Sequence, residues 1–197
     1  MHCRQKLPIT RYHEMATNPL LFELSQTIQI KHAYAFLHYN KKGIAQTLLH
    51  QLKYKDRTQI GTILGRWFGY AIKEAIIDNQ IDIIMPIPIH RRRWMKRGYN
   101  QSEIIARGMN EILKLPLNNF TLKRHRFTKS QTKKDKVSRW QHANDLYYLR
   151  KIEAIRQKRI LLVDDVITTG ATISSAIDLL HTAGIMEVSV ACLATGK

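Results

Sequence analysis

The stretch over residues 160–172 constrains the fold of this chain more than any other part of the sequence. It is ILLVDDVITTGAT, with four aliphatic residues, two adjacent acids, two further aliphatic residues and a run of small hydroxyl residues around one glycine. The pattern predicts a buried strand over residues 160–163 that leads into a helix. Adjacent carboxylates repel one another and are costly to desolvate, so a site that keeps both ionised usually offers them a cation or several hydroxyl donors. Asp164 and Asp165 therefore indicate a ligand-binding site.

Short apolar runs alternate with helical patterns over most of the chain. Strands are expected at residues 33–39, 81–86, 160–163 and 188–193, and helices follow at about 44–52, 58–77, 100–113 and 173–180. Strands that alternate with helices in this way predict an α/β fold with a mainly parallel sheet flanked by helices.

Two of the expected helices carry local signals of their packing and of their start. Gly61, Gly65 and Gly69 recur every four residues on one face of the second helix, which suits close packing against another element. Asn100 is a suitable N-cap for the third helix, and Glu103 lies at the position that would complete a capping box.

The residues that follow the acidic pair have the composition of a phosphate-binding loop. In parallel sheets, ligands bind outside the carboxyl ends of the strands, where we expect this loop to lie. Glycine permits close backbone approach, hydroxyls donate hydrogen bonds, and the dipole of the following helix adds positive potential. One glycine and no lysine argue against the Walker A loop of an NTPase. An ordinary strand-to-helix turn with a threonine cap is the alternative. The residues concerned are Thr168, Thr169, Gly170, Ala171 and Thr172.

The basic charge is concentrated in the middle third of the chain. The net charge of +17 arises from 32 Lys and Arg against 15 Asp and Glu, and residues 91–139 hold 15 of the basic residues but only three acidic ones. Basic residues interleaved with aromatic ones predict binding of single-stranded nucleic acid, whereas a merely solubilising surface is the alternative. The aromatic residues are Trp94, Tyr99, Phe120 and Phe127, and the candidate nucleic-acid-binding residues are Lys129, Lys133, Lys134 and Lys136.

Cysteine content and hydropathy indicate the cellular compartment. Cys3 and Cys192 cannot form a disulfide framework, and neither lies in a local metal-binding pattern. No apolar run approaches the ~20 residues of a membrane span, and the N-terminus lacks the apolar core of a signal peptide. We expect a soluble, cytoplasmic protein that makes no contact with a membrane.

The stretch over residues 160–172 resembles, at every position, the signature of phosphoribosyltransferases that bind phosphoribosyl pyrophosphate. The resemblance implies that Asp164 and Asp165 hold the ribose 2- and 3-hydroxyls, as the catalytic pair, while residues 168–172 hold the 5-phosphate. It also implies a Mg²⁺ ion near Asp164, which is bound through the ligand and not directly by protein side chains.

A second stretch, over residues 85–107, resembles the competence protein F family. It carries Pro-x-Pro, several basic residues and then Arg-Gly-aromatic-Asn-Gln, and the upstream triplet Leu52-Lys53-Tyr54 is similar as well. Phosphoribosyltransferases place their pyrophosphate loop after an early strand of the sheet, so the resemblance implies that role for this segment. The residues assigned to the pyrophosphate are Pro88, His90, Arg91, Arg92 and Arg93.

The N-terminus departs from the family pattern. Members commonly begin with a four-cysteine zinc module, and MHCRQKLP resembles its last turn, with Cys3 as the surviving ligand position. One thiolate cannot build a tetrahedral zinc site, so we expect no structural zinc. We expect a loosely packed extension over residues 1–30 and a phosphoribosyltransferase-like domain over residues 31–197.

The resemblances imply a phosphoribosyltransferase linked to DNA uptake. Pyrophosphate would leave from C1 of the sugar, and the protein would contribute positioning and charge stabilisation, with a basic segment over residues 123–136 closing over the site. No segment identifies an acceptor base. The alternative is a non-catalytic competence factor that binds single-stranded DNA, keeps the pocket as a sensor or relic, and has a helicase-like partner.

Overall fold

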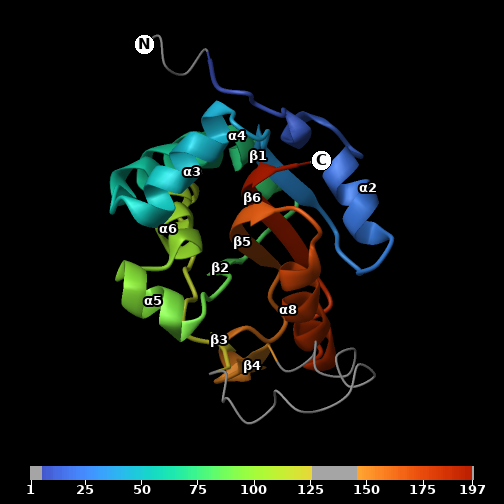
Figure 1. Ribbon diagram of the computed structural model, residues 1–197. Helices are drawn as coiled ribbons and strands as arrows, with labels where there is room; N and C mark the ends of the chain where they lie inside the picture. Colours follow the sequence, from blue (N-terminus) through green and yellow to red (C-terminus); the bar gives the residue numbers. More distant parts are fainter. Residues whose placement is uncertain (1–5, 126–145, 197) are drawn as a thin grey trace, which may run out of the picture.

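Four parallel strands form the central sheet, in the order β1-β6-β5-β2 (Figure 1). The computed structural model describes residues 6–125 and 146–196. Parallel neighbours that are joined through helices confirm the expected α/β class with a mainly parallel sheet. The strands are β1 Ala33–His38, β2 Ile83–Pro86, β5 Ile160–Ile167 and β6 Val188–Thr195, and a separate antiparallel hairpin consists of β3 Leu122–Arg124 and β4 Tyr147–Leu149.

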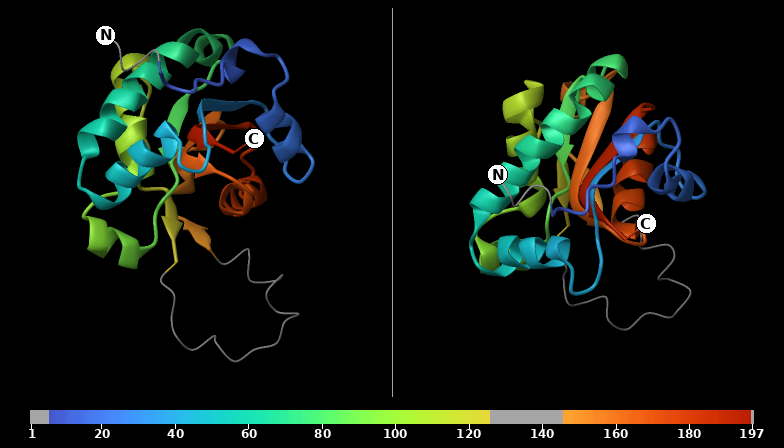
Figure 2. Two further views of the ribbon diagram at one scale, coloured as in Figure 1. Left: turned by 45° about the horizontal axis from the view of Figure 1, so that its top comes forward. Right: turned by 90° about the horizontal axis from the view of Figure 1, so that it is seen from above.

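Helices cover both faces of this sheet (Figure 2). Alternate residues of β5 pack into two different cores, with Ile160 and Leu162 facing α2 and α8, and Leu161 and Val163 facing α3, α4 and α6. Because both faces are buried, the strand is a continuous apolar run and not an alternating one. Within the described ranges, no helix is long and apolar enough to cross a membrane. The helices are α2 Pro19–Ser25, α3 Ile44–Tyr54, α4 Thr58–Asp78, α5 Arg91–Arg97, α6 Gln101–Leu113 and α8 Ala171–Thr182, with 3-10 turns η1 Tyr12–Glu14 and η4 Ile152–Ala154.

Short flanking segments pair with both outer strands of the sheet. On β1, the backbone N–H of His38 donates to Pro8 O at 2.7 Å. On β2, the backbone N–H of Ile84 donates to Pro116 O at 2.9 Å. Unpaired backbone groups at the edge of a sheet can pair with other chains, and these two segments provide hydrogen-bond partners for part of each edge.

The N-terminal segment packs more tightly than the sequence suggested. Tyr12, Leu20, Leu24 and Ile28 are all buried, and they belong to the hydrophobic core on the α8 side of the sheet. The expectation of loose packing is therefore wrong for this part of the chain, because its apolar residues complete that core. The division of the chain at residue 30 stays a prediction, and Cys3 lies outside the described residues.

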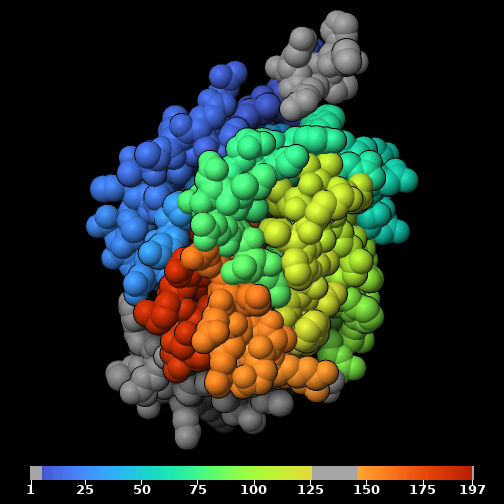
Figure 3. Space-filling model, turned by 180° about the vertical axis from the view of Figure 1, so that it is seen from behind, coloured from blue at the N-terminus to red at the C-terminus, as the bar shows by residue number. Residues whose placement is uncertain are grey.

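Glycines set the distance between α4 and α6, which lie directly against each other on the face shown in Figure 3. A Cβ atom on Gly65 would lie 2.4 Å from the carbonyl oxygen of Ile105, and one on Gly108 would lie 2.4 Å from that of Thr62. Backbone atoms of packed helices cannot yield to such an overlap. The expectation that the α4 glycines pack closely against another element is confirmed, and α6 is that element.

This packing makes a specific prediction about stability. Gly65→Ala should lower the free energy of unfolding by about 1 to 3 kcal/mol, the usual cost of overpacking, although alanine favours a helix by about 1 kcal/mol. Urea denaturation measures the change. Gly61→Ala is the matched control, because the atoms nearest to a Cβ atom there are the ends of the Ile104 and Leu52 side chains and not backbone atoms. Equal losses in the two variants would contradict this account of the α4–α6 contact.

Candidate phosphoribosyl-binding site

The acidic pair lies within β5 and not beyond its end. The strand was expected to stop at Val163, but it continues to Ile167, and Asp164 pairs in register with Cys192 of β6. The expectation was wrong because parallel pairing with the long strand β6 extends β5 past the point where its side chains become polar. Both carboxylates are therefore held on the sheet, and they are only partly exposed.

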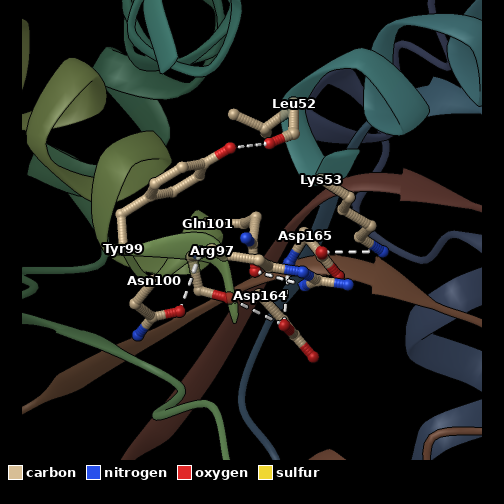
Figure 4. Close-up of polar contacts among 9 residues, drawn as sticks. Leu52, Lys53, Arg97, Tyr99, Asn100, Gln101, Asp164 and Asp165 are labelled. Carbon is tan, nitrogen blue, oxygen red and sulfur yellow. Dashed lines mark hydrogen bonds and ion pairs between the residues drawn. The ribbon is translucent and has the colours of Figure 1, made fainter. Parts of the chain in front are cut away.

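A hydroxyl and a backbone amide satisfy the first carboxylate. The Ser102 hydroxyl donates to Asp164 Oδ1 at 2.9 Å, and the backbone N–H of Asp165 donates to the same oxygen at 2.8 Å (Figure 4). Ser102 stands at the start of α6, 62 residues away in sequence. No local pattern in the sequence singled out Ser102, although this residue directly follows the Asn-Gln pair of the second motif.

A lysine compensates the second carboxylate. Lys53 Nζ lies 2.7 Å from Asp165 Oδ2, and the two side chains are 23% and 16% exposed (Figure 4). The acidic pair was expected to need a cation or hydroxyl donors, and the chain itself provides one of each. Lys53 was noted only within the triplet Leu52-Lys53-Tyr54. That triplet was the one sequence signal for it.

Burial and mutual repulsion still disfavour ionisation of this pair. Burial first, and the neighbouring charge of Asp165 second, raise the pKa of Asp164 from its ordinary value of 3.8 to about 7. The hydrogen bonds from the Asp165 amide and from Ser102, and the charge of Lys53, act in the opposite direction without cancelling the rise. Near neutral pH, Asp164 is therefore able to bind and release a proton.

The loop before α6 positions both donors. Asn100 Oδ1 accepts from the backbone N–H of Ser102 at 3.2 Å, while Asn100 Nδ2 donates to Ile87 O at 2.9 Å. The Tyr99 hydroxyl donates to the carbonyl oxygen of Leu52 in the last turn of α3, next to Lys53. Asn100 therefore caps α6 as expected, and one short loop holds the ends of two helices at the acidic pair.

Arg97 and Gln101 extend this arrangement. The Arg97 guanidinium lies 5.0 Å from the centroid of the Tyr54 ring and donates to Gln101 Oε1 at 2.8 Å. Gln101 is 1% exposed, and its Nε2 has no hydrogen-bond partner among the described residues. A buried amide donor without a partner is unusual and is consistent with a ligand that supplies the acceptor.

The basic run of the second motif is a helix and not a loop. Arg91–Arg97 form α5, whose residues are at least partly exposed, and His90 caps it by accepting from the backbone N–H of Arg92 at 3.2 Å. Arg91, Arg92 and Arg93 make no hydrogen bond or ion pair to the acidic pair in the described structure. The expected loop is thus confined to residues 87–90, including Pro88. The run lacks helix breakers up to Gly98, which has a φ of 78° and ends the helix.

Two further details differ from the expectations. Glu103 forms no capping box, because its carboxylate instead accepts from Arg107 at 2.7 Å and from Asn119 at 2.9 Å. Tyr99 was grouped with the aromatic residues expected to bind nucleic acid, but its ring packs against the α4-side core and its hydroxyl donates to Leu52 O.

The hydroxyl-glycine loop lies beside the acidic pair. Asp164 and residues 166–173 line a hollow of about 40 Å³, with the side chains of Thr168, Thr169 and Thr172 exposed. Gly170 has a φ of 77° and directly precedes α8, and no side chain caps that helix. The alternative of a turn with a threonine cap is therefore wrong. Gly170 is also held by the fold, since a Cβ atom there would lie 2.7 Å from Leu24 Cδ2.

A larger cleft lies between α5 and the β3–β4 hairpin. Its volume is about 630 Å³. Trp94 is 53% exposed and Tyr148 is 37% exposed, and both line it together with Arg91, Lys123 and Arg124. Glu103 and Asn100 also line the cleft, so it reaches the loop that positions Ser102. Lys129, Lys133, Lys134, Lys136 and Phe127 lie outside the described residues.

No group of three or more His, Cys, Asp or Glu side chains within the described ranges could hold a metal ion. Binding of a magnesium ion near Asp164 through the ligand stays a prediction.

Comparison with known proteins identifies the family. A family model described as the phosphoribosyl transferase domain matches residues 50–197. Competence protein F of Haemophilus influenzae is 30% identical over 147 residues, which are 73% of this chain and 64% of that protein. DNA utilization protein YhgH of Escherichia coli K12 is 28% identical over 149 residues, which are 74% of this chain and 65% of that protein. The chain thus spans slightly less than two thirds of the length of these curated relatives.

The matched region contains Lys53, the loop before α6, the acidic pair and the hydroxyl-glycine loop, which are the parts that the structure brings together. The chain therefore belongs to the phosphoribosyl transferase domain family, and it is a homologue of competence protein F, as the motifs over residues 85–107 and 160–172 indicated.

Proposed function

We propose that the chain binds phosphoribosyl pyrophosphate together with Mg²⁺ and acts as a phosphoribosyltransferase in the handling of DNA. The observation that carries the proposal is the hollow at the carboxyl end of β5, where Asp164 and the loop over residues 168–172 lie side by side. A carboxylate that accepts sugar hydroxyls and a helix N-terminus that accepts a phosphate are the two functions that ribose 5-phosphate requires.

The residues have distinct roles in this proposal. Asp164 and Asp165 accept the hydrogen bonds of the ribose 2- and 3-hydroxyls, and the backbone N–H groups and hydroxyls of residues 168–172 bind the 5-phosphate. Gln101 Nε2 and the Tyr147 hydroxyl, both buried without partners in the described structure, are available for further ligand oxygens. Magnesium, when bound through the ligand, would neutralise part of the pyrophosphate charge.

The pyrophosphate is assigned to residues 87–90 and the start of α5. His90, Arg92 and Arg93 lie close enough that the two arginines lower the pKa of the histidine, after the larger effects of burial and Arg124. Several cations around one short loop provide the positive potential that a departing pyrophosphate requires. The acceptor of the phosphoribosyl group stays unassigned.

The first test of this proposal is ligand binding. Asp165→Asn should weaken magnesium-dependent binding of phosphoribosyl pyrophosphate by about 1 to 3 kcal/mol, because a charge-assisted hydrogen bond is lost. Calorimetry with phosphoribosyl pyrophosphate and Mg²⁺ measures the change, and a screen of bases for pyrophosphate release tests turnover. Unchanged affinity in a folded Asp164→Asn, Asp165→Asn double variant would refute the assignment.

The raised pKa of Asp164 predicts a pH dependence of stability. Its folded-state pKa of about 7 exceeds the ordinary value of 3.8, so the folded protein binds more protons than the unfolded chain between these values. The free energy of unfolding should therefore fall as the pH rises from about 4 to 7, by at most about 1.4 kcal/mol per pH unit. Urea denaturation at several pH values should show this slope in the difference between the wild type and Asp164→Asn, because His13, His32 and His90, whose pKa values are lowered, contribute the opposite slope to both proteins. The exposed Asp178→Asn is the control, and it should keep the wild-type profile. A difference that does not change with pH would contradict the prediction.

Binding of single-stranded nucleic acid is the second candidate function, and the cleft of about 630 Å³ favours it. Exposed Trp94 and Tyr148 offer flat surfaces for bases, while Arg91, Lys123 and Arg124 offer charge for a phosphate backbone. The proposal also agrees with the names of the relatives, which refer to competence and to DNA utilization. A helicase-like partner belongs to the same proposal.

Titration of a labelled oligonucleotide tests this function. Trp94→Ala should weaken binding by about 1 to 3 kcal/mol if one base stacks on the indole, while Met95→Ala, a change at an exposed neighbour on α5, should have little effect. Each neutralised phosphate should add roughly 0.7 to the slope of log affinity against log salt on single strands. A slope near zero, or equal effects of the two substitutions, would leave the cleft without a nucleic-acid role.

A further inference from the structure

The ion pair between Lys53 and Asp165 is largely buried, which is unusual for an ion pair that serves only stability. Its members are 23% and 16% exposed, so both charges are largely withdrawn from water. The desolvation cost of such a pair offsets most of its attraction, so the pair alone adds little to stability. In the described structure, the second carboxylate oxygen of Asp165 accepts no hydrogen bond. Both partners can therefore form further hydrogen bonds, because one carboxylate oxygen is unused and an ammonium group carries three donors.

The residues on both sides of Lys53 are fixed. The carbonyl oxygen of Leu52 accepts from the Tyr99 hydroxyl, and the Tyr54 ring lies under the Arg97 guanidinium, 5.0 Å from its centroid. One tether comes from Arg97, the last residue of α5, and the other from Tyr99 in the segment that joins α5 to α6. The ammonium group is thus held at the acidic pair by contacts of its two neighbours and does not depend only on its own flexible stem.

The location of the ammonium group indicates its partner in a ligand. Asp164 lines the hollow of the loop assigned to the 5-phosphate, whereas Asp165 does not. If the two acids hold the ribose hydroxyls, this places the 3-hydroxyl, which is nearer the 5-phosphate, at Asp164 and the 2-hydroxyl, which is next to C1, at Asp165. A cation bound to Asp165 then lies on the side of the sugar that carries the pyrophosphate. Lysine suits this position because it is a compact charge with three rotatable donors.

We propose that Lys53 is a ligand-binding residue of this site, which compensates Asp165 in the free protein and contacts the pyrophosphate of the bound ligand. The proposal rests on the proposed function, and it adds α3 to the elements that bind phosphoribosyl pyrophosphate. It also assigns a role to the triplet Leu52-Lys53-Tyr54, because Leu52 and Tyr54 hold the lysine between them. Tyr99 is then a positioning residue, since it acts through Leu52.

The test compares two ligands that differ in the pyrophosphate. Lys53→Met should weaken binding of phosphoribosyl pyrophosphate with Mg²⁺ by about tenfold or more, which corresponds to about 1.4 kcal/mol per factor of ten. Binding of ribose 5-phosphate, which lacks that group, should change by less than about threefold. Lys55→Met is the matched control, because Lys55 is an exposed lysine at the end of the same helix and has no ion pair in the described structure. Lys53→Arg should retain most of the affinity, because it keeps the charge.

The outcomes separate this inference from the proposed function. Absence of phosphoribosyl pyrophosphate binding in the wild type would refute both. Wild-type binding together with unchanged affinity in Lys53→Met, or with equal losses for the two ligands, would refute only the role of Lys53. Urea denaturation checks that each variant is folded. If Lys53→Met does not fold, Lys53→Gln, which keeps a polar end without the charge, takes its place with the same expected contrast.

A double-mutant cycle tests the positioning role of Tyr99. Tyr99→Phe removes only the hydroxyl that donates to Leu52, so it should weaken phosphoribosyl pyrophosphate binding less than Lys53→Met does. If Tyr99 acts through Lys53, the Tyr99→Phe change should have no further effect in the Lys53→Met background. Additive losses would show that the two residues act independently and would overturn this role for Tyr99.

Discussion

Two adjacent carboxylates on a central strand need hydrogen-bond donors and positive charge nearby, and the rest of this site depends on that constraint. Asp164 and Asp165 lie on β5, between β6 and β2, where neither can be fully hydrated. A serine from α6 and a lysine from α3 provide the compensating donor and charge. The pKa of Asp164 nevertheless stays raised to about 7, so compensation in the free protein is partial. A ligand that brings two hydroxyls and a cation would complete it.

The helices on the α4 side of the sheet deliver these donors, and their spacing matters for that reason. Glycines allow the backbones of α4 and α6 to approach closely, which brings Ser102 at the start of α6 over the sheet. A side chain at Gly65 would push against the backbone at Ile105, three residues after Ser102. The same substitution that destabilises the fold should therefore also disturb the acidic pair. Stability and site geometry are linked through one helix contact.

The sequence alone predicted the order of strand, loop and helix in the one continuous segment that contains the apolar run, the two acids and Gly170. It placed the end of the strand four residues too early, because the pairing of β5 with β6 extends the strand to Ile167, and the ligand site there stays a prediction. Lys53 could not be derived in this way, because only the folding of α3 over the sheet brings it to Asp165. Glu103 satisfied the spacing of a capping box, but the competing donors of Arg107 and Asn119 decided its actual contacts. A local sequence pattern does not show which donors elsewhere in the folded chain will compete for a side chain.

The acidic pair and the basic cleft are physically connected, which relates the two candidate functions to each other. Asn100 lines the cleft, and it also caps the helix that carries Ser102 and bonds to Ile87 at the end of β2. A strand of nucleic acid bound along α5 would contact the same loop that positions the donor to Asp164. Coupling between two sites requires an element that both ligands bias. If both ligands bias the loop over residues 98–100, a cleft ligand and a phosphoribosyl ligand would each alter the affinity for the other by the same factor.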